Sequence, residues 1–285
     1  MAPHAAQSAS VTPMSSSASS VEWIHDREEV FHDLWAEGIN PETVFVDESF
    51  EACTAPETKQ IIKWLGNVQG KRILDVGCGA GEGAVYFAKK GAFVTATDIS
   101  AGMLRVVQRV ALEHRVHVSV KQCSAEGLPF ADESFDIVYT GNLLHHVDLE
   151  QTLLEMKRVL KPGGVLVSWD PLAHNPLINI YRRIAVDVRT PDEHPLKMSE
   201  IRVFKRHFKE VKYECFWFFT LWLFINFKLC ERIDPNKERY WKKIIKEHKR
   251  LEPVYTKLAA LDRIFLKCFP FFKRHCWNIA LHCVK

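Results

Sequence analysis

The sequence of 285 residues lacks most of the patterns that assign a protein to a class at once. None of its eight cysteines lies in a CxxC pair, which favours reduced thiols in the cytosol over a disulfide framework. Two His-Cys pairs, at 275–276 and 282–283, do not predict a metal site, because the second pair lies in an alternating, strand-like run whose side chains diverge. The first 20 residues have no charged side chain and no apolar core, so we expect a disordered tail rather than a secretory signal or mitochondrial leader. The uncharged aromatic run at 215–227 has 13 residues, whereas a helix that spans a bilayer takes about 20.

The charge is divided unevenly along the chain, although the formal total is only +3. Residues 1–200 carry 18 basic and 27 acidic side chains, whereas residues 201–285 carry 20 basic and 8 acidic ones. The second part also holds 18 of the 32 aromatic residues. With 47% hydrophobic and 26% charged residues the chain is globular, and the division predicts two different functional surfaces.

Strand and helix patterns alternate from residue 71 onward, which predicts right-handed βαβ units and a parallel sheet covered on both faces. The expected strands are 72–76, 93–97, 116–121, 135–140, 165–169, 211–215 and 278–284. The expected helices are 21–37, 56–65, 83–90, 102–114, 151–160 and 198–208. We therefore predict an α/β fold with a Rossmann-like, doubly wound, mostly parallel seven-stranded sheet. An aromatic and basic helical insertion at 216–276 would interrupt the domain formed by 21–215 and 277–285 before its last strand.

A glycine-rich turn follows the first expected strand in the sequence Asp75-Val-Gly77-Cys-Gly79-Ala-Gly81. Its spacing is GxGxG, and Glu82 stands where a dinucleotide fingerprint needs another glycine. A carboxylate there would repel a pyrophosphate, so the turn suits a ligand with a nucleoside and no phosphates. Asp98 ends the second strand, where a carboxylate can accept both hydroxyls of a ribose.

Five segments in this order and spacing make the sequence resemble the class I S-adenosylmethionine-dependent methyltransferases, particularly the branch that modifies quinones, lipids and other small molecules. They are LDVGCGAGEG at 74–83, TATDIS at 95–100, CSAEGLPF at 123–130, FDIVYTGNLLHHV at 135–147 and LKPGGVLVSWDP at 160–171. The resemblance covers about residues 45–215 and implies S-adenosyl-L-methionine as cofactor. It also implies transfer of its methyl group by in-line displacement to an O, N or C nucleophile of a lipophilic small molecule.

The resemblance implies a cofactor site along the ends of the first strands. The implied contacts are Asp75, Gly77 and Asn142 with the methionyl part, Gly79 and Gly81 beside it, Asp98 with the ribose, Ile99 and Met103 with the adenine face, and Ser124, Ala125 and Glu126 with the adenine edge. Ser124 departs from the family, which commonly has an acidic residue there, although a hydroxyl can still accept the adenine hydrogen bond.

A base is needed only when the nucleophile must lose a proton, and five residues are candidates. We favour His174 and His194, which lie in a proline-rich, lid-like run, over His145 and His146, whose role is often structural in such proteins. Asp170, at the end of the fifth strand, either orients the substrate or caps the turn before the following proline.

The aromatic and basic stretch at 215–274 admits several interpretations. After the run at 215–227, a helix expected from Pro235 has one aromatic and apolar side amid many basic residues, and a second apolar patch follows at 265–272. Aromatic rings among Lys and Arg suit an anionic membrane surface, which we favour, and they also suit nucleic acid. The alternatives are that the aromatics line a substrate pocket or form a homodimer interface.

The sequence thus predicts a methyltransferase for a lipophilic small molecule, in the cytosol and associated with a membrane surface. The competing hypotheses are an RNA methyltransferase, for which the motifs are less typical, and a non-catalytic assembly protein that binds S-adenosylmethionine.

Overall fold

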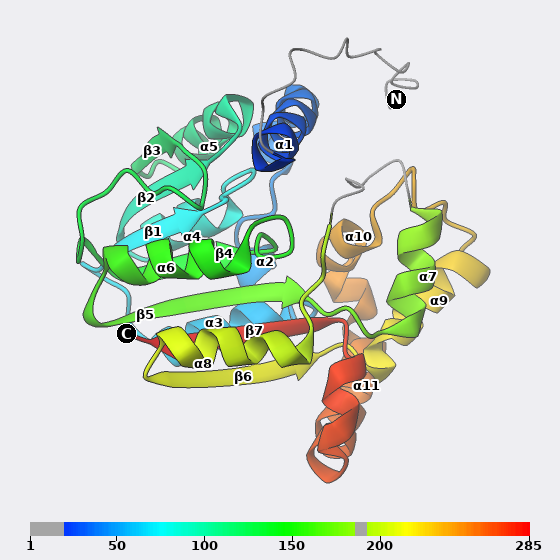
Figure 1. The fold of residues 1–285 in the computed structure, drawn as a ribbon. Coiled ribbons are helices and arrows are strands. Elements are labelled where there is room, and N and C mark those ends of the chain that lie inside the picture. The colour runs from blue at the N-terminus through cyan, green and yellow to red at the C-terminus, as the bar shows by residue number, and fades with distance from the viewer. Residues whose placement is uncertain (1–19, 186–192) are drawn as a thin grey trace.

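The computed structural model describes residues 20–185 and 193–285 (Figure 1). The predicted disordered tail and the middle of the proline-rich run, residues 186–192, lie outside the described residues. Seven strands form one sheet: β1 Arg72–Val76, β2 Phe93–Asp98, β3 Val118–Gln122, β4 Phe135–Gly141, β5 Leu160–Pro171, β6 Glu210–Phe216 and β7 Asn278–Val284. Their spatial order is β3-β2-β1-β4-β5-β7-β6, and only β7 runs antiparallel to its two neighbours. The predicted doubly wound, mostly parallel sheet is confirmed.

Helices cover both faces of the sheet. They are α1 Ser20–Glu37, α2 Glu48–Glu51, α3 Pro56–Leu65, α4 Glu82–Lys89, α5 Ala101–Glu113, α6 Leu149–Val159, α7 Pro176–Ile184, α8 Ile201–His207, α9 Trp222–Leu229, α10 Tyr240–Lys246 and α11 His248–Cys268. Because side chains alternate along a strand, Ile73 of β1 packs with α3, α4 and α5, whereas Leu74 packs with α6 and α8 on the other face (Figure 1).

Some element boundaries differ from the predicted ones for local reasons. Strand β3 begins at Val118 because the turn after α5 uses the preceding residues: Arg115 has a φ of 55°, and the Val116 amide donates to the Ala111 carbonyl. The helix expected from Pro235 begins only at Tyr240, in α10.

The segment between β6 and β7 forms α9, α10 and α11 beside the carboxyl end of β5, with its own apolar cluster (Figure 1). A buried carboxylate holds the entry to this segment: Asp262 of α11 accepts hydrogen bonds from the Phe218 and Phe219 amides, at 3.1 and 2.5 Å, and from the Thr220 hydroxyl at 2.8 Å. Among the helices of the described ranges, none combines the length and the apolar character needed to cross a membrane.

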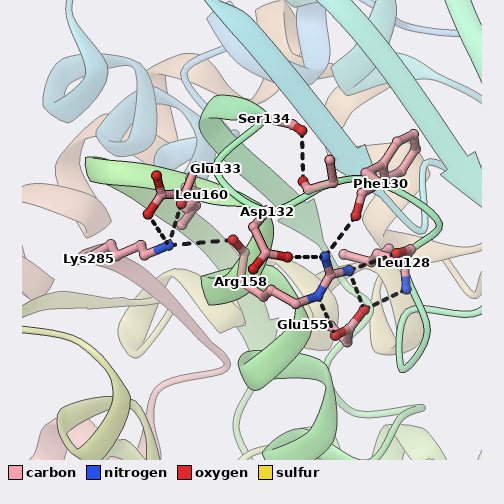
Figure 2. A network of polar contacts seen from close by, with 10 residues as sticks. Leu128, Phe130, Asp132, Glu133, Ser134, Glu155, Arg158, Leu160 and Lys285 are labelled. Atoms are coloured by element: carbon pink, nitrogen blue, oxygen red, sulfur yellow. Dashed lines mark hydrogen bonds and ion pairs between the residues drawn. The ribbon is translucent and has the colours of Figure 1, made fainter.

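One arginine fixes the loop between β3 and β4 (Figure 2). The Arg158 guanidinium donates to the Leu128 and Phe130 carbonyls and to the carboxylates of Asp132 and Glu155, in five hydrogen bonds of 2.7–2.8 Å. These bonds use all five donors of its planar fork. The loop carries Ser124, Ala125 and Glu126, which line the site described next. Arg158, in the last turn of α6, therefore holds that part of the site in position.

Candidate active site

One cavity of about 370 Å³ lies at the carboxyl ends of β1, β2 and β4, a volume within the usual range for small-molecule sites. The glycine turn after β1 forms one wall, α1 forms another, and α7 and the insertion close the far side. Eleven of the predicted site residues line it, namely Asp75, Gly77, Gly79, Asp98, Ile99, Ser124, Ala125, Glu126, Asn142, His145 and His146.

Two glycines of the turn have no room for a side chain, but only one of them borders the cavity. Gly77 has a φ of 67°, and a Cβ there would lie 2.7 Å from the Leu143 side chain, so no other residue fits without displacing Leu143. Gly81 has a φ of 91° and precedes α4, where a Cβ would press against Val107 at 3.0 Å. Gly81 therefore serves the packing of α4 against α5, and it is not among the cavity-lining residues.

Two buried carboxyl groups face the glycine turn. Asp75 at the end of β1 is 1% exposed, and burial, with the charges of Glu82 and Asp98, raises its pKa to about 8. Its Oδ2 atom has no hydrogen-bond partner among the described residues. Asp98 accepts hydrogen bonds from the Gly79 and Ser100 amides, both at 2.9 Å, while burial raises its pKa.

The Glu126 carboxylate lies beside Ser124, at the position where the family commonly has an acidic residue. The Ser124 hydroxyl donates a short hydrogen bond to the Glu126 carboxylate and accepts one from the Glu126 amide at 3.2 Å. The Asp148 amide donates to the other oxygen of Glu126 at 3.1 Å. A carboxylate thus lies beside Ser124 on the cavity wall, although the sequence places the acid two residues further on.

Helix α1 covers the cavity, and the sequence did not predict this role. Asp33 accepts hydrogen bonds from the Ser100 hydroxyl at 2.5 Å and from the Gly102 amide at 2.7 Å, which ties α1 to the start of α5. A Cβ on Gly102 would lie 2.8 Å from the Asp33 carboxylate, so glycine is required there. The contact brings Trp35 and its neighbours on α1 over the glycine turn.

Two of the five candidate catalytic residues form a buried pair. His145 Nδ1 lies 2.9 Å from Asp170 Oδ1, and the side chains are 3% and 0% exposed. A carboxylate at Nδ1 favours the tautomer in which Nε2 carries the lone pair, and it stabilises the imidazolium. Asp170 lies behind His145 and does not itself line the cavity, so it acts on this site through His145. His146 lines the cavity beside His145, with Nδ1 3.5 Å from the Glu28 carboxylate.

Three other predicted residues lie elsewhere. The His174 backbone carbonyl accepts from His275 Nδ1 at 3.0 Å, which turns this segment away from the cavity. His194 is exposed, and only its amide approaches the pair described above, donating to the His145 carbonyl at 2.7 Å. Met103 is fully buried in the core under α5. None of the three is among the cavity-lining residues, so the preferred bases His174 and His194 are not brought to the cofactor residues.

A cluster of possible metal ligands borders the same cavity. One donor atom from each of His145, His146 and Glu193 lies within 4.8 Å of the others. This donor set suits a divalent transition metal, and Asp170, which accepts from His145 Nδ1, would orient the His145 ring. No local motif indicates this cluster, because Glu193 follows His146 by 47 residues along the chain.

The far side of the cavity is aromatic. Trp217 of the insertion lines it together with Trp277, which follows the insertion, and Tyr181 of α7. Trp217 is 2% exposed and is the residue of the run at 215–227 that reaches the cavity. Glu57 of α3 also lines the cavity, where burial raises its pKa to about 7, and it accepts from the Asn278 amide side chain at 2.7 Å. No local sequence pattern distinguishes Glu57 from an ordinary first-turn helix acid.

Comparison with known proteins identifies a methyltransferase domain in this chain. A family profile described as a methyltransferase domain matches residues 74–168. The chain is 37% identical over 129 residues to methyltransferase GfsG of Streptomyces halstedii, covering 43% of this chain and 46% of the relative. It is 40% identical over 118 residues to a ubiquinone biosynthesis O-methyltransferase of Alkalilimnicola ehrlichii, covering 41% and 47%. The chain spans about half the length of these curated relatives.

Solved structures share the whole architecture. The phosphoethanolamine N-methyltransferase 2 of Haemonchus contortus in complex with S-adenosyl-L-methionine has a TM-score of 0.57 and 23% identity, covering 94% of this chain and 60% of that chain. The YcgJ protein of Bacillus subtilis has a TM-score of 0.51 and 22% identity, covering 80% and 97%. At these identities the likeness shows the fold alone. Residues 74–168 thus match a methyltransferase domain, and the fold is one that solved methyltransferases share.

Proposed function

We propose that this protein transfers a methyl group from S-adenosylmethionine to an oxygen, nitrogen or carbon nucleophile of a lipophilic small molecule. One observation carries the proposal. A single cavity has buried carboxyl groups and a glycine turn at one end and an aromatic wall at the other. The first end suits a nucleoside with a cationic group, and the second suits an apolar acceptor.

The residues present fit the cofactor of the family. Asp75 Oδ2 is buried without a hydrogen-bond partner in the described chain, and the ammonium of a methionyl group would supply one. Asp98 uses one bond on each oxygen, which leaves lone pairs for the hydroxyls of a ribose. Ile99 and Ala125 supply apolar surface for the adenine, and Glu126 supplies an acceptor beside its edge.

When bound, the sulfonium supplies an activated methyl carbon, and the remaining requirements are alignment and exclusion of water. The aromatic wall around Trp217 and Trp277 holds an apolar acceptor and keeps out water. For a phenol or an enol carbon, His145 takes the proton at Nε2, and Asp170 stabilises the resulting imidazolium. Glu57, with its pKa near 7, is a second proton acceptor on the opposite wall.

The direct test is incubation of the protein with methyl-labelled S-adenosylmethionine and a fractionated lipid extract. We expect label in an apolar product, with Asp98→Ala strongly reducing its formation and the exposed control Leu112→Ser leaving it unchanged. Label in RNA instead would favour the RNA methyltransferase. Tight cofactor binding without transfer to any fraction would favour the non-catalytic assembly protein.

We also infer contact with a membrane surface, through the end of α11 and the 3₁₀ turn that follows, η5 (Pro270–His275). Ile264, Phe269 and Phe271 are 63%, 54% and 68% exposed, and Lys267 and Lys273 lie in the same segment. Exposed rings with basic neighbours suit the headgroup region of anionic lipids.

Sedimentation with anionic liposomes tests this contact, and Phe271→Ser should weaken it while Leu112→Ser should not. High salt should also weaken it, because basic side chains contribute. If the protein does not sediment with the liposomes, and sedimentation without lipid shows a dimer, the patch is a homodimer interface.

A further inference from the structure

Two basic side chains of α10 face the cavity instead of the solvent. Arg239, which precedes the helix, and Lys242 both line the cavity. The Arg239 guanidinium lies 4.0 Å from the centre of the Trp35 ring, and Lys242 Nζ lies 5.1 Å from the same ring. Two cations therefore contact one aromatic ring at the junction of α1 and the insertion.

Neither cation makes an ion pair with a described carboxylate, although the charge of Glu82 acts on Lys242. Among the described residues, no carboxylate oxygen lies within 4.0 Å of Arg239 or Lys242, and neither side chain donates a hydrogen bond that meets ordinary distance limits. The adjacent Lys243 shows the contrast, because it makes ion pairs with Glu231, Glu238 and Glu247. The basic residues of α10 thus divide into a paired structural lysine and two unpaired cations that face the cavity.

The surroundings make this arrangement costly unless an anion is bound. Burial lowers the pKa of Arg239 to about 10, and it also lowers the pKa of Lys242, an effect that the charge of Glu82 partly offsets. Like charges repel, and the tryptophan ring offsets only part of that repulsion and of the lost hydration. A carboxylate or phosphate between the two side chains would satisfy both, with charge-assisted hydrogen bonds from the guanidinium fork.

We propose that Arg239 and Lys242 form an anion subsite of the cavity, which binds a carboxylate or phosphate group of a bound ligand. Its position restricts the source of that group to two. Lys242 also lines a smaller hollow with Ala80 beside the glycine turn, where its charge offsets that of Glu82 and the carboxylate of the methionyl part would reach it. On its other side the subsite opens to the aromatic wall, where an acidic group on a lipophilic acceptor would reach it. The subsite itself does not depend on the proposed methyl transfer, but the assignment to the cofactor carboxylate rests on that proposed function.

Calorimetric titration of Arg239→Met and Lys242→Met tests the subsite without an activity assay. Met keeps the length of the side chain and removes the charge, and the exposed Lys246→Met of the same helix is the matched control. The four probes are S-adenosylhomocysteine, 5′-methylthioadenosine (which lacks the amino-acid part), decanoate and decanol. Loss of a charge-assisted contact should weaken binding of the probe that uses the subsite by about tenfold or more.

The probes distinguish the two sources. If the cofactor carboxylate is bound, the variants weaken S-adenosylhomocysteine and leave 5′-methylthioadenosine unchanged. If an acidic acceptor is bound, they weaken decanoate relative to decanol and leave both nucleosides unchanged. Unchanged binding of all four probes, or an equal effect of Lys246→Met, would overturn the proposal.

A failure of the proposed function gives a different result, namely wild-type protein that binds neither nucleoside. The decanoate and decanol titrations remain informative in that case. Arg239→Gln, which keeps a polar planar group, provides a second variant should Arg239→Met fail to fold, with thermal unfolding as the check.

Discussion

The unpartnered carboxyl group of Asp75 leads to a quantitative prediction about proton release. The perturbation is a change of pH from 6 to 9 during titration with S-adenosylhomocysteine. Without ligand, the pKa of Asp75 is about 8, because burial and the nearby charges of Glu82 and Asp98 disfavour its ionised form. At pH 7 only about a tenth of the molecules are then ionised at this position. An ammonium beside the carboxyl favours the ionised form, so binding releases close to one proton at this pH.

The same linkage fixes the dependence of affinity on pH. Below about pH 8 the affinity should rise by about tenfold for each pH unit, because binding is coupled to the loss of one proton. It should level off near pH 8 and then decline, since a free α-amino group itself titrates at about 7.7–8.0. Stability without ligand depends on pH in the opposite direction. The free energy of unfolding falls as pH rises from about 4 to about 8, because in this range the Asp75 carboxyl is ionised in the unfolded chain but still mostly protonated in the folded protein.

Calorimetry in two buffers of different ionisation enthalpy measures the released proton directly. Asp75→Asn should abolish the release and flatten the pH profile, with weaker binding at pH 8. The matched control is Glu57→Gln, because Glu57 is also buried at the cavity with a raised pKa but lies on the opposite wall. A wild-type protein that releases no proton between pH 6 and 8 would refute this account of the site.

Three further predictions concern a glycine of α4, the buried pair of His145 and Asp170, and the metal cluster. Gly83→Ala should lower the free energy of unfolding by about 1–3 kcal/mol, because the added Cβ would lie 2.5 Å from the Tyr139 ring. Gly127→Ala should have little effect, because the space around Gly127 is open. Chemical denaturation compares the two variants. Asp170→Asn should reduce kcat by about 10²- to 10⁴-fold for an acceptor that loses a proton and shift the pH profile, whereas an unchanged kcat would show that His145 is structural. Treatment with EDTA should leave activity intact, because an activated methyl group needs no Lewis acid, and loss of activity that zinc or magnesium restores would instead make His145, His146 and Glu193 a metal site.

The parts of the fold that follow from short-range patterns were predictable. Apolar runs such as Ile73-Leu74 specify buried strands, and the spacing of strands and helices specifies a parallel sheet. The glycine turn and Asp98 were also readable, because backbone approach and a carboxylate at a strand end each require particular residue types at particular offsets. For this reason the predicted cofactor residues meet on one cavity, apart from Gly81 and Met103.

The parts that depend on long-range contacts were not predictable. His174 and His194 lie in the proline-rich run, but hydrogen bonds of their backbone to other segments determine their orientation. No local sequence pattern indicates such bonds. His145 is functional in our account because Asp170, 25 residues away, lies behind it. Its neighbour His146 has the same local sequence context without that partner.

The uneven division of charge now has a structural explanation at the cavity. The acidic part of the chain supplies Asp75 and Asp98, which suit a cationic and hydroxyl-bearing ligand. The basic part does not only decorate a surface, because Arg239 and Lys242 face the same cavity. A ligand that satisfies both the acidic and the basic groups must carry positive and negative groups, as the methionyl part of the cofactor does, or it must be bound together with an acidic acceptor. The aromatic wall between α7 and β7 restricts such an acceptor to a molecule with a large apolar body. If the cofactor carboxylate does not occupy Arg239 and Lys242, the charge pattern and the cavity together favour an amphiphilic acid over a neutral lipid or an RNA as the acceptor.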